Sequence, residues 1–81
     1  MTRSFHTTIA TVDTVYFDGM SISVTCPGSE GELTVLKDHE PFVAVLKAGI
    51  ITVHCENKKT EIFEIESGIL EVHRGGVVIL L

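Results

Sequence analysis

The chain has 81 residues, which is the size of one small domain, spanning residues 1–81. Hydrophobic residues make up 44% of it, and a domain this small needs such a share because it buries only roughly 60–65% of its unfolded surface. Six Lys and Arg against eleven Asp and Glu give a formal net charge of −5. An acidic domain repels phosphate backbones and anionic membrane surfaces, so the composition argues against nucleic acid as a partner.

No export or membrane-spanning segment is expected. The polar start, residues 1–6, is not followed by an uninterrupted apolar stretch, so no secretory signal is predicted. The longest apolar runs, such as 77–81, fall far short of the ~18 residues that a membrane span needs. We therefore expect a soluble protein that faces the cytoplasm, with Cys26 and Cys55 as reduced, buried thiols rather than a disulfide.

The first half of the chain shows turn signals between strand-like runs. Asp18-Gly19 lies between two apolar pairs and predicts a two-residue hairpin turn, because Gly tolerates the positive φ that such a turn demands. Pro27 lacks a donor for a ladder hydrogen bond, so residues 26–29 are predicted to end a strand. The segment 40–47 is predicted to be extended, since it contains a proline and β-branched residues.

The second half alternates with period 2. Residues 49–55, 60–66 and 69–73 each place apolar side chains on one face, which is typical of half-buried strands. Polar turns are predicted at 57–59 and at Gly75-Gly76, between these runs.

The run 77–81 is apolar on both faces, which predicts a central or doubly covered strand; an edge strand covered by a missing segment is the alternative. The whole pattern gives eight to ten short strands. An all-β chain of this kind must close a barrel or stack two sheets to bury its apolar faces.

Catalytic and metal-binding patterns are weak. His54 and Cys55 are adjacent, so on a strand they point to opposite faces and cannot ligate one ion, and no metal site is predicted. Ser29 and His39 occupy one loop-strand-loop region, but no nucleophile elbow accompanies them. Phosphate-binding glycine fingerprints are also absent, so no catalytic residue and no cofactor are predicted.

Two polar loops remain as candidate contact surfaces. Glu30 and Glu32 form either a solvated rim or an acidic contact patch. The loop 38–42 projects polar groups from a β framework, where binding residues tend to lie. Within it Phe42 is either an apolar interface anchor or the start of the next strand's core face, and composition does not choose between them.

Five short motifs, in order and at near-constant spacing, resemble the epsilon subunit of F-type ATP synthases over nearly the whole chain. They are Phe17-Asp18-Gly19 at the end of a first hairpin, Gly28-Ser29-Glu30-Gly31-Glu32-Leu33, His39-x-Pro41, Leu46-Lys47-x-Gly49, and Ser67-Gly68-Ile69-Leu70-Glu71-Val72. The chain departs from the family pattern at Asp38, where the family has Gly, and at Ala48, where it has Pro. The family's helical hairpin lies outside residues 1–81, so neither the inhibitory nor the ATP-binding role of that hairpin is assigned to these residues.

The resemblance implies a flattened β-sandwich of about ten short strands and a non-catalytic rotor subunit in the central stalk. Such a subunit links the gamma subunit to the polar loops of the c-ring and couples proton flow to ATP synthesis, as a peripheral protein at the cytoplasmic face of the bacterial inner membrane. The implied c-ring contacts are Glu30, Gly31 and Glu32. The implied gamma contacts are His39, Glu40, Pro41, Phe42 and Ala44.

Two other functions are weighed against this one. An unrelated small β-sandwich that binds a peptide or sugar would need an open cleft or a free sheet edge with convergent polar groups. An enzyme that uses His39 is the third hypothesis, and it has the least support because that histidine has no evident catalytic partner.

Overall fold

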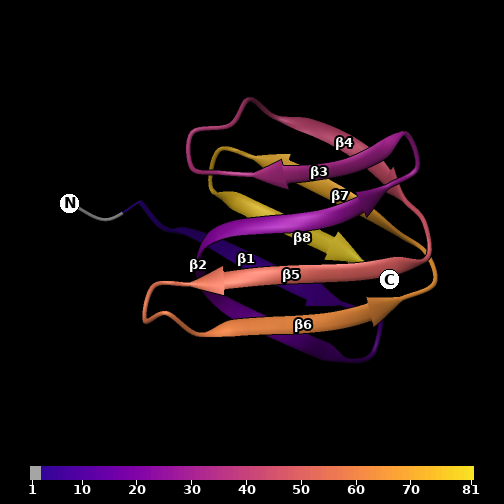
Figure 1. Cartoon of the computed structure of the whole chain (residues 1–81), viewed down its shortest axis with the longest axis horizontal. Coiled ribbons are helices and arrows are strands. Elements are labelled where there is room, and N and C mark those ends of the chain that lie inside the picture. The colour runs from indigo at the N-terminus through magenta and orange to yellow at the C-terminus, as the bar shows by residue number, and fades with distance from the viewer. Residues whose placement is uncertain (1–2) are drawn as a thin grey trace.

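A computed structural model describes residues 3–81, which contain eight strands and no helix (Figure 1). The strands are β1 (Phe5–Ala10), β2 (Val15–Gly28), β3 (Gly31–Val35), β4 (Phe42–Leu46), β5 (Gly49–Cys55), β6 (Thr60–Ile65), β7 (Gly68–His73) and β8 (Gly76–Leu80). The all-β prediction is confirmed. Within residues 3–81 no helix is long and apolar enough to cross a bilayer.

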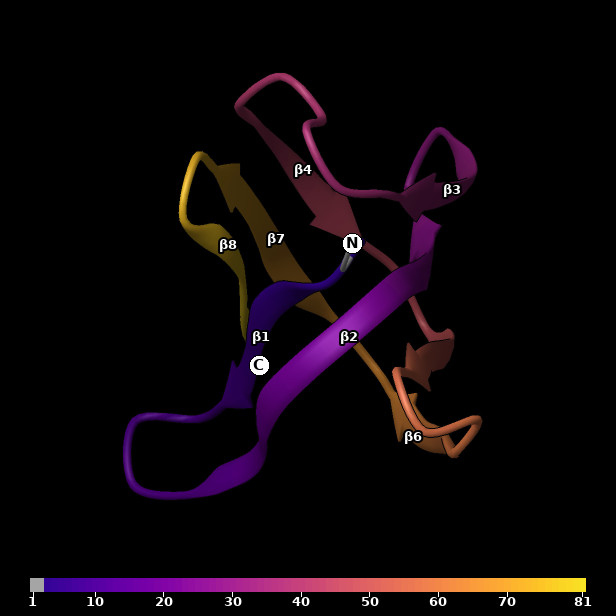
Figure 2. The same cartoon turned by 90° about the vertical axis from the view of Figure 1, so that its left-hand side faces the viewer.

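The strands form two packed layers that share one long strand, β2. The first part of β2 pairs with β1, and its later part pairs with β3 and β5. One layer therefore holds β4, β7, β8 and β1, and the other holds β3, β5 and β6. Figure 2 shows β2 passing from its hairpin with β1 across to β3. The result is a flattened sandwich with extents of 35 × 24 × 20 Å.

The change of layer occurs around Ser21. The pairing of β2 with β1 ends there, pairing with β5 begins there, and the register with β5 shifts between Ser21 and Ser23. A bulge of this kind bends a strand. The buried hydroxyls of Ser21 and Thr7 hydrogen-bond to each other at 2.5 Å, and no buried side-chain N or O in the described part of the chain lacks a partner.

Aliphatic side chains from both layers fill the space between them. The fully buried ones include Ile9, Leu70 and Ile79 from one layer and Ile51 and Val53 from the other. The predicted alternation is correct along β5, β6 and β7, where every second side chain points into this core. Such alternation places one apolar set in the core and leaves the other set on the outer faces.

The hairpin turn predicted at Asp18-Gly19 is wrong. These two residues lie inside β2, where they pair with Thr8 and Thr7 of β1. The chain reverses earlier, at 11–14, where the amide of Thr11 donates to the carbonyl of Thr14. Pairing along the whole of β1 keeps the Asp-Gly pair extended, so tertiary pairing overrides a local turn preference.

The other predicted breaks match the structure. β2 ends at Gly28, β4 is extended, and turns join β5 to β6 and β7 to β8. The run 77–81 belongs mainly to β8, which is central because it lies between β1 and β7. It is not covered on both faces, since Leu80 on its outer side is 48% exposed.

Gly76 is the glycine whose backbone position leaves the least room for a side chain. Its φ is +148°, and a Cβ there would lie 2.1 Å from the carbonyl oxygen of His6, its partner across the parallel β1–β8 pair. We expect Gly76→Ala to lower the free energy of unfolding by about 3 kcal/mol, because both the strained φ and the backbone clash oppose it.

Gly75→Ala is the matched control, since a Cβ at Gly75 would meet nothing within 4 Å. It should change stability by less than about 1 kcal/mol. Urea unfolding of both variants gives the comparison. Equal stabilities for the two variants would contradict the close approach of β8 to β1.

Candidate functional site

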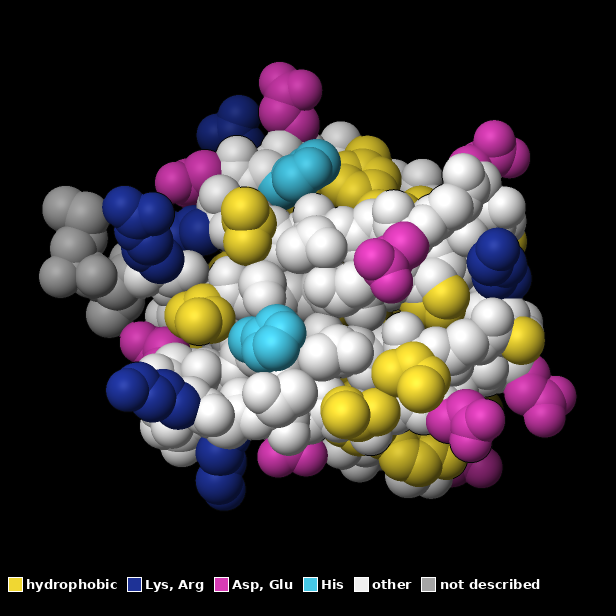
Figure 3. Space-filling model, in the orientation of Figure 1, with side chains coloured by type: hydrophobic (Ala, Val, Ile, Leu, Met, Phe, Trp, Pro, Cys, Tyr) yellow, Lys and Arg dark blue, Asp and Glu magenta, His cyan; other side chains and the backbone are white. Residues whose placement is uncertain are grey.

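Positively charged side chains gather at one end of the sandwich, whereas carboxylates lie at both ends. Of the six Lys and Arg, five lie in the turns and loops at the end where the N-terminus emerges; this basic end carries Arg3, Lys37, Lys58, Lys59 and Arg74. The turns at the opposite, acidic end carry Asp13, Glu30 and Glu66, with Glu32 just inside β3 and Lys47 as the one cation. In Figure 3 dark blue predominates on the left and magenta on the right.

The residues expected to contact the c-ring lie together at the acidic end. Glu30 is in the β2–β3 turn, Gly31 opens β3 with φ +131°, and Glu32 pairs with Pro27 of β2. Both carboxylates are exposed, and the described residues form no salt bridge with them. This turn can therefore present two free carboxylates to a partner.

The residues expected to contact gamma come from the β3–β4 loop and β4. Asp38 has φ +66°, so the position where the family pattern has Gly does adopt the left-handed region, and Asp tolerates it better than most residues. Nδ1 of His39 lies 3.1 Å from the carbonyl oxygen of Glu40, and the His39 and Phe42 ring centroids are 5.0 Å apart. The loop, including Pro41, is exposed.

Strand β4 turns two of these residues inward. Phe42 and Ala44 are partly buried and pack against the core, which favours the core reading of Phe42 over the exposed anchor. Their neighbours Val43 and Val45 point outward and are 66% and 56% exposed. Alternation along β4 predicts that these two valines share one face and that Phe42 and Ala44 share the other, but it does not determine which face is the outer one.

The outer face of this layer carries a row of apolar side chains next to the acidic end. Val45 pairs with Ile69 of β7, and Ile69 pairs with Leu80 of β8. All three are substantially exposed, from 39% for Ile69 to 56% for Val45. Val15 of β2 is also exposed, at 61%, but Ala10 of β1, which pairs with both Leu80 and Val15, is buried. Neighbouring exposed apolar side chains of this kind are typical of protein-binding surfaces.

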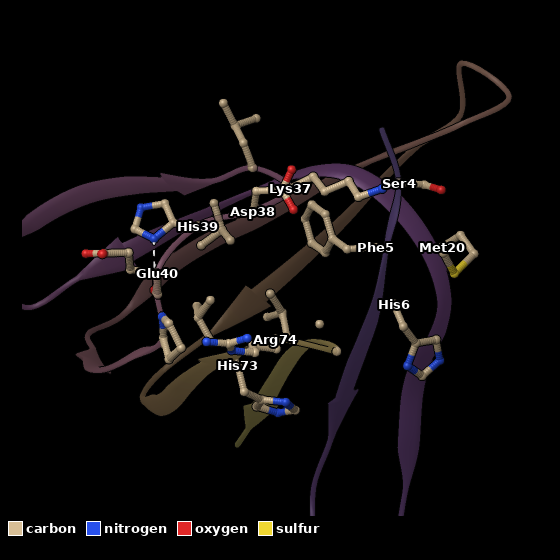
Figure 4. A pocket seen from close by; sticks show the side chains of 17 residues that line it. Ser4, Phe5, His6, Met20, Lys37, Asp38, His39, Glu40, His73 and Arg74 are labelled. Carbon is tan, nitrogen blue, oxygen red and sulfur yellow. Dashed lines mark hydrogen bonds between the residues drawn. The ribbon is translucent and has the colours of Figure 1, made fainter. Parts of the chain in front are cut away.

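A cavity of about 620 Å³ opens at the basic end, between the two layers (Figure 4). Apolar side chains from β1, β3, β7 and β8 form part of its wall, namely Phe5, Val35, Val72 and Val77. The polar part of the wall comes from the β3–β4 loop, the β7–β8 turn and the start of β1. It includes Lys37, Asp38, His39, Glu40, His73, Arg74 and His6.

These groups do not assemble a reaction centre. Ser29 lies in the turn at the acidic end and His39 in the loop at the basic end, so the two cannot act on one substrate atom. His6 is paired with Asp18 of the neighbouring strand at the surface. Among residues 3–81 no group of three or more His, Cys, Asp or Glu side chains could hold a metal ion.

The arrangement defines a class of protein: a small β-sandwich with exposed charged side chains at its ends and exposed apolar side chains on one outer face. The comparison with known families then identifies it. The chain belongs to the family described as ATP synthase, Delta/Epsilon chain, beta-sandwich domain, which matches residues 4–81. The hypothesis of an unrelated binding module is therefore wrong.

Relatives and solved structures agree with this assignment. The ATP synthase epsilon chain of Sulfurimonas denitrificans is 38% identical over 90% of this chain and 56% of its own length. That of Chlorobium limicola is 32% identical over 96% of this chain and 89% of its own length. A chain in the cryo-EM structure of the Euglena gracilis mitochondrial ATP synthase OSCP/F1/c-ring superposes with a TM-score of 0.89 at 28% identity, covering 99% of this chain and 51% of that chain.

A chain in the Tetrahymena thermophila mitochondrial ATP synthase central stalk/c-ring structure has a TM-score of 0.75 at 21% identity, over 94% of this chain and 61% of that one, which shows the shared fold. The epsilon chain of Campylobacter curvus is 46% identical over 82% of this chain and 50% of its own length. This chain thus spans about half the length of the Sulfurimonas and Campylobacter relatives.

Both thiols are free, as predicted, but only Cys26 is buried, and Cys55 is half-buried at the end of β5. Burial raises the pKa of the Cys26 thiol from 9.0 to about 12. At pH 8 only about one Cys26 side chain in ten thousand is then a thiolate, the reactive form. We expect a thiol reagent to modify Cys55 in the native protein and Cys26 only after denaturation.

The same pKa change predicts a pH dependence. Because the folded-state pKa of Cys26 lies above 9.0, its contribution to stability is complete below pH 9 and is lost as the pH rises towards about 12. Cys26→Ala should have a lower free energy of unfolding than the unmodified chain. Its free energy of unfolding should also lack the fall at high pH that Cys26 causes. Rapid modification of both thiols in the native state would contradict the burial of Cys26.

Proposed function

We propose that this domain is a non-catalytic subunit in the central stalk of a proton-translocating F-type ATP synthase. It links the gamma subunit to the c-ring and couples proton flow to ATP synthesis. The family match over residues 4–81 carries this proposal, and relatives named ATP synthase epsilon chain support it. The bacterial relatives favour a peripheral position at the cytoplasmic face of the bacterial inner membrane.

The physical role of such a subunit is to transmit torque. A coupling element has to resist deformation between its two contact surfaces, and close-packed β layers joined by continuous hydrogen-bonded strands are stiff. Here β2 ties both layers together, and the strands run from the basic end to the acidic end. A load applied at one end therefore reaches the other through backbone hydrogen bonds and core packing.

The acidic end is the proposed c-ring contact, through Glu30, Gly31 and Glu32. Two exposed carboxylates on a tight turn suit a partner loop that offers cations or hydrogen-bond donors. Gly31, with φ +131°, lets the turn stay narrow, and a Cβ there would meet nothing within 4 Å. The turn can thus approach a partner backbone closely.

The β3–β4 loop and β4 are the proposed gamma contact. His39, Glu40 and Pro41 are exposed and can touch a partner directly. Phe42 and Ala44 support this contact indirectly, because they pack against the core and so fix the position of β4. The exposed valines Val43 and Val45 supply apolar contact area that the sequence motifs did not indicate.

Binding of gamma tests this assignment. We expect Val43→Asp to weaken binding to the purified gamma subunit at least tenfold, or about 1.4 kcal/mol, because the change puts a charge into an apolar contact. Ile62→Asp on β6 is the matched control, with 63% exposure against 66% for Val43, but on the other layer. Titration calorimetry gives both affinities. If the unmodified chain does not bind gamma, the proposed function fails.

Charge reversal tests the c-ring contact. Glu32→Lys should lower proton-coupled ATP synthesis several-fold in the assembled enzyme while leaving the melting temperature of the isolated chain unchanged, because Glu32 is exposed. Glu56→Lys makes the same charge change at the basic end and should keep the coupling intact. Membrane vesicles that carry each variant allow the measurement. Equal coupling in both variants would remove the acidic end from the c-ring contact.

A further inference from the structure

We infer that the cavity at the basic end receives an acidic segment of the gamma subunit, with Arg74 as the cation that binds its carboxylate. This inference rests on the proposed function and extends it to a residue that none of the sequence motifs contains. It depends on the composition of the cavity wall, the environment of Arg74, and the continuity of the cavity with the β3–β4 loop.

The cavity wall combines an apolar part with a polar rim. Phe5, Val35, Val72 and Val77 are each at most 9% exposed, so they already belong to the core and the cavity reaches down to it. A volume of about 620 Å³ lies within the range of roughly 300–1,000 Å³ typical of ligand sites. An occupant with both apolar and polar groups would match both parts of the wall.

Arg74 is the cation best placed to bind an incoming group. Its side chain is exposed and makes no hydrogen bond or ion pair with the described residues, and in Figure 4 it points into the cavity. A guanidinium offers five donors in a planar fork that fits a carboxylate. Lys37, on the β3–β4 loop, adds a second positive charge to the wall.

The two carboxylates of the wall do not occupy this position. Asp38 and Glu40 both lie on the β3–β4 loop, whereas Arg74 lies on the β7–β8 turn, and Glu40 points away from the cavity in Figure 4. Five of the six Lys and Arg gather at this end of a chain with net charge −5. The wall itself carries two cations, Lys37 and Arg74, and two carboxylates, Asp38 and Glu40. The position of Arg74, rather than the net charge of the wall, therefore favours an anionic group of the occupant at this point.

The β7–β8 turn holds Arg74 in place. Arg74 and Gly75 are the only residues between the two strands, and His73 pairs with Gly76 directly across the hairpin. Gly76 is also paired with His6 of β1, so the turn is anchored to a third strand. A residue on so short a turn loses little backbone freedom when a partner binds.

The cavity is continuous with the proposed gamma contact. His39, Glu40 and Pro41 line it and also form the exposed loop that is proposed to touch gamma. A partner that lies on this loop covers the mouth of the cavity. A segment of that same partner is therefore the occupant that the structure favours, rather than a freely diffusing anion.

The test compares charge reversals at the two ends of the molecule. Arg74→Glu should weaken binding of the purified gamma subunit at least tenfold in titration calorimetry, and Arg74→Gln should give a smaller loss. Lys47→Glu makes the same charge change at the acidic end and should alter the affinity less than twofold. Equal melting temperatures of all variants and the unmodified chain show that the fold is kept.

Each result has one meaning. If the unmodified chain binds gamma but Arg74→Glu binds equally well, the inference is overturned and the proposed function stands. A similar loss for Arg74→Glu and Lys47→Glu would also overturn it, because overall charge would then be the cause. No binding by the unmodified chain would remove both the proposed function and the inference. If both Arg74 variants bind more weakly and Lys47→Glu does not, and if the loss is smaller for Arg74→Gln than for Arg74→Glu, the cavity is supported as the docking site.

Discussion

The structure depends on one strand, β2, that bonds to both layers. With 14 residues it is long enough to pair with β1, bend at Ser21, and then pair with β3 and β5. The bend brings polar backbone and a hydroxyl into the interior, and the buried Thr7–Ser21 hydrogen bond satisfies that hydroxyl. Without this corner the two layers would be joined only by the short pairing of β2 with β4 at Gly28 and Leu46. The rest of their contact would be apolar, and apolar contacts are non-directional and do not fix one orientation.

The same corner determines where the contact surfaces lie. Once the layers are aligned, all the turns fall at two ends, and the charged residues in those turns gather there too. The acidic end collects carboxylates from the turns after β1, β2 and β6. At the basic end the layers part enough to leave the cavity, whose wall includes residues of five strands, the β3–β4 loop and the β7–β8 turn. The gathering of cations at one end is thus a product of the topology.

Much of the fold follows from period-2 patterns. The residues of β5 and β7 that alternate in the sequence are those that point into the core, because a pleated strand turns successive side chains to opposite faces. The prediction failed at Asp18-Gly19, where pairing with β1 holds a good turn sequence extended. It was also incomplete for Phe42 and Cys55, whose degree of burial depends on neighbours that are distant in the sequence.

The sequence by itself determined the all-strand character of the chain, the faces of its regular strands and its likeness to the epsilon family, because alternation and short motifs are local properties. Only the tertiary structure decided that Val43 and Val45 rather than Ala44 reach the surface, and that Arg74 lies across a cavity from the β3–β4 loop. These facts depend on which strands pair and in which register. Register is fixed by the burial of whole faces at once, so no single stretch of sequence contains it.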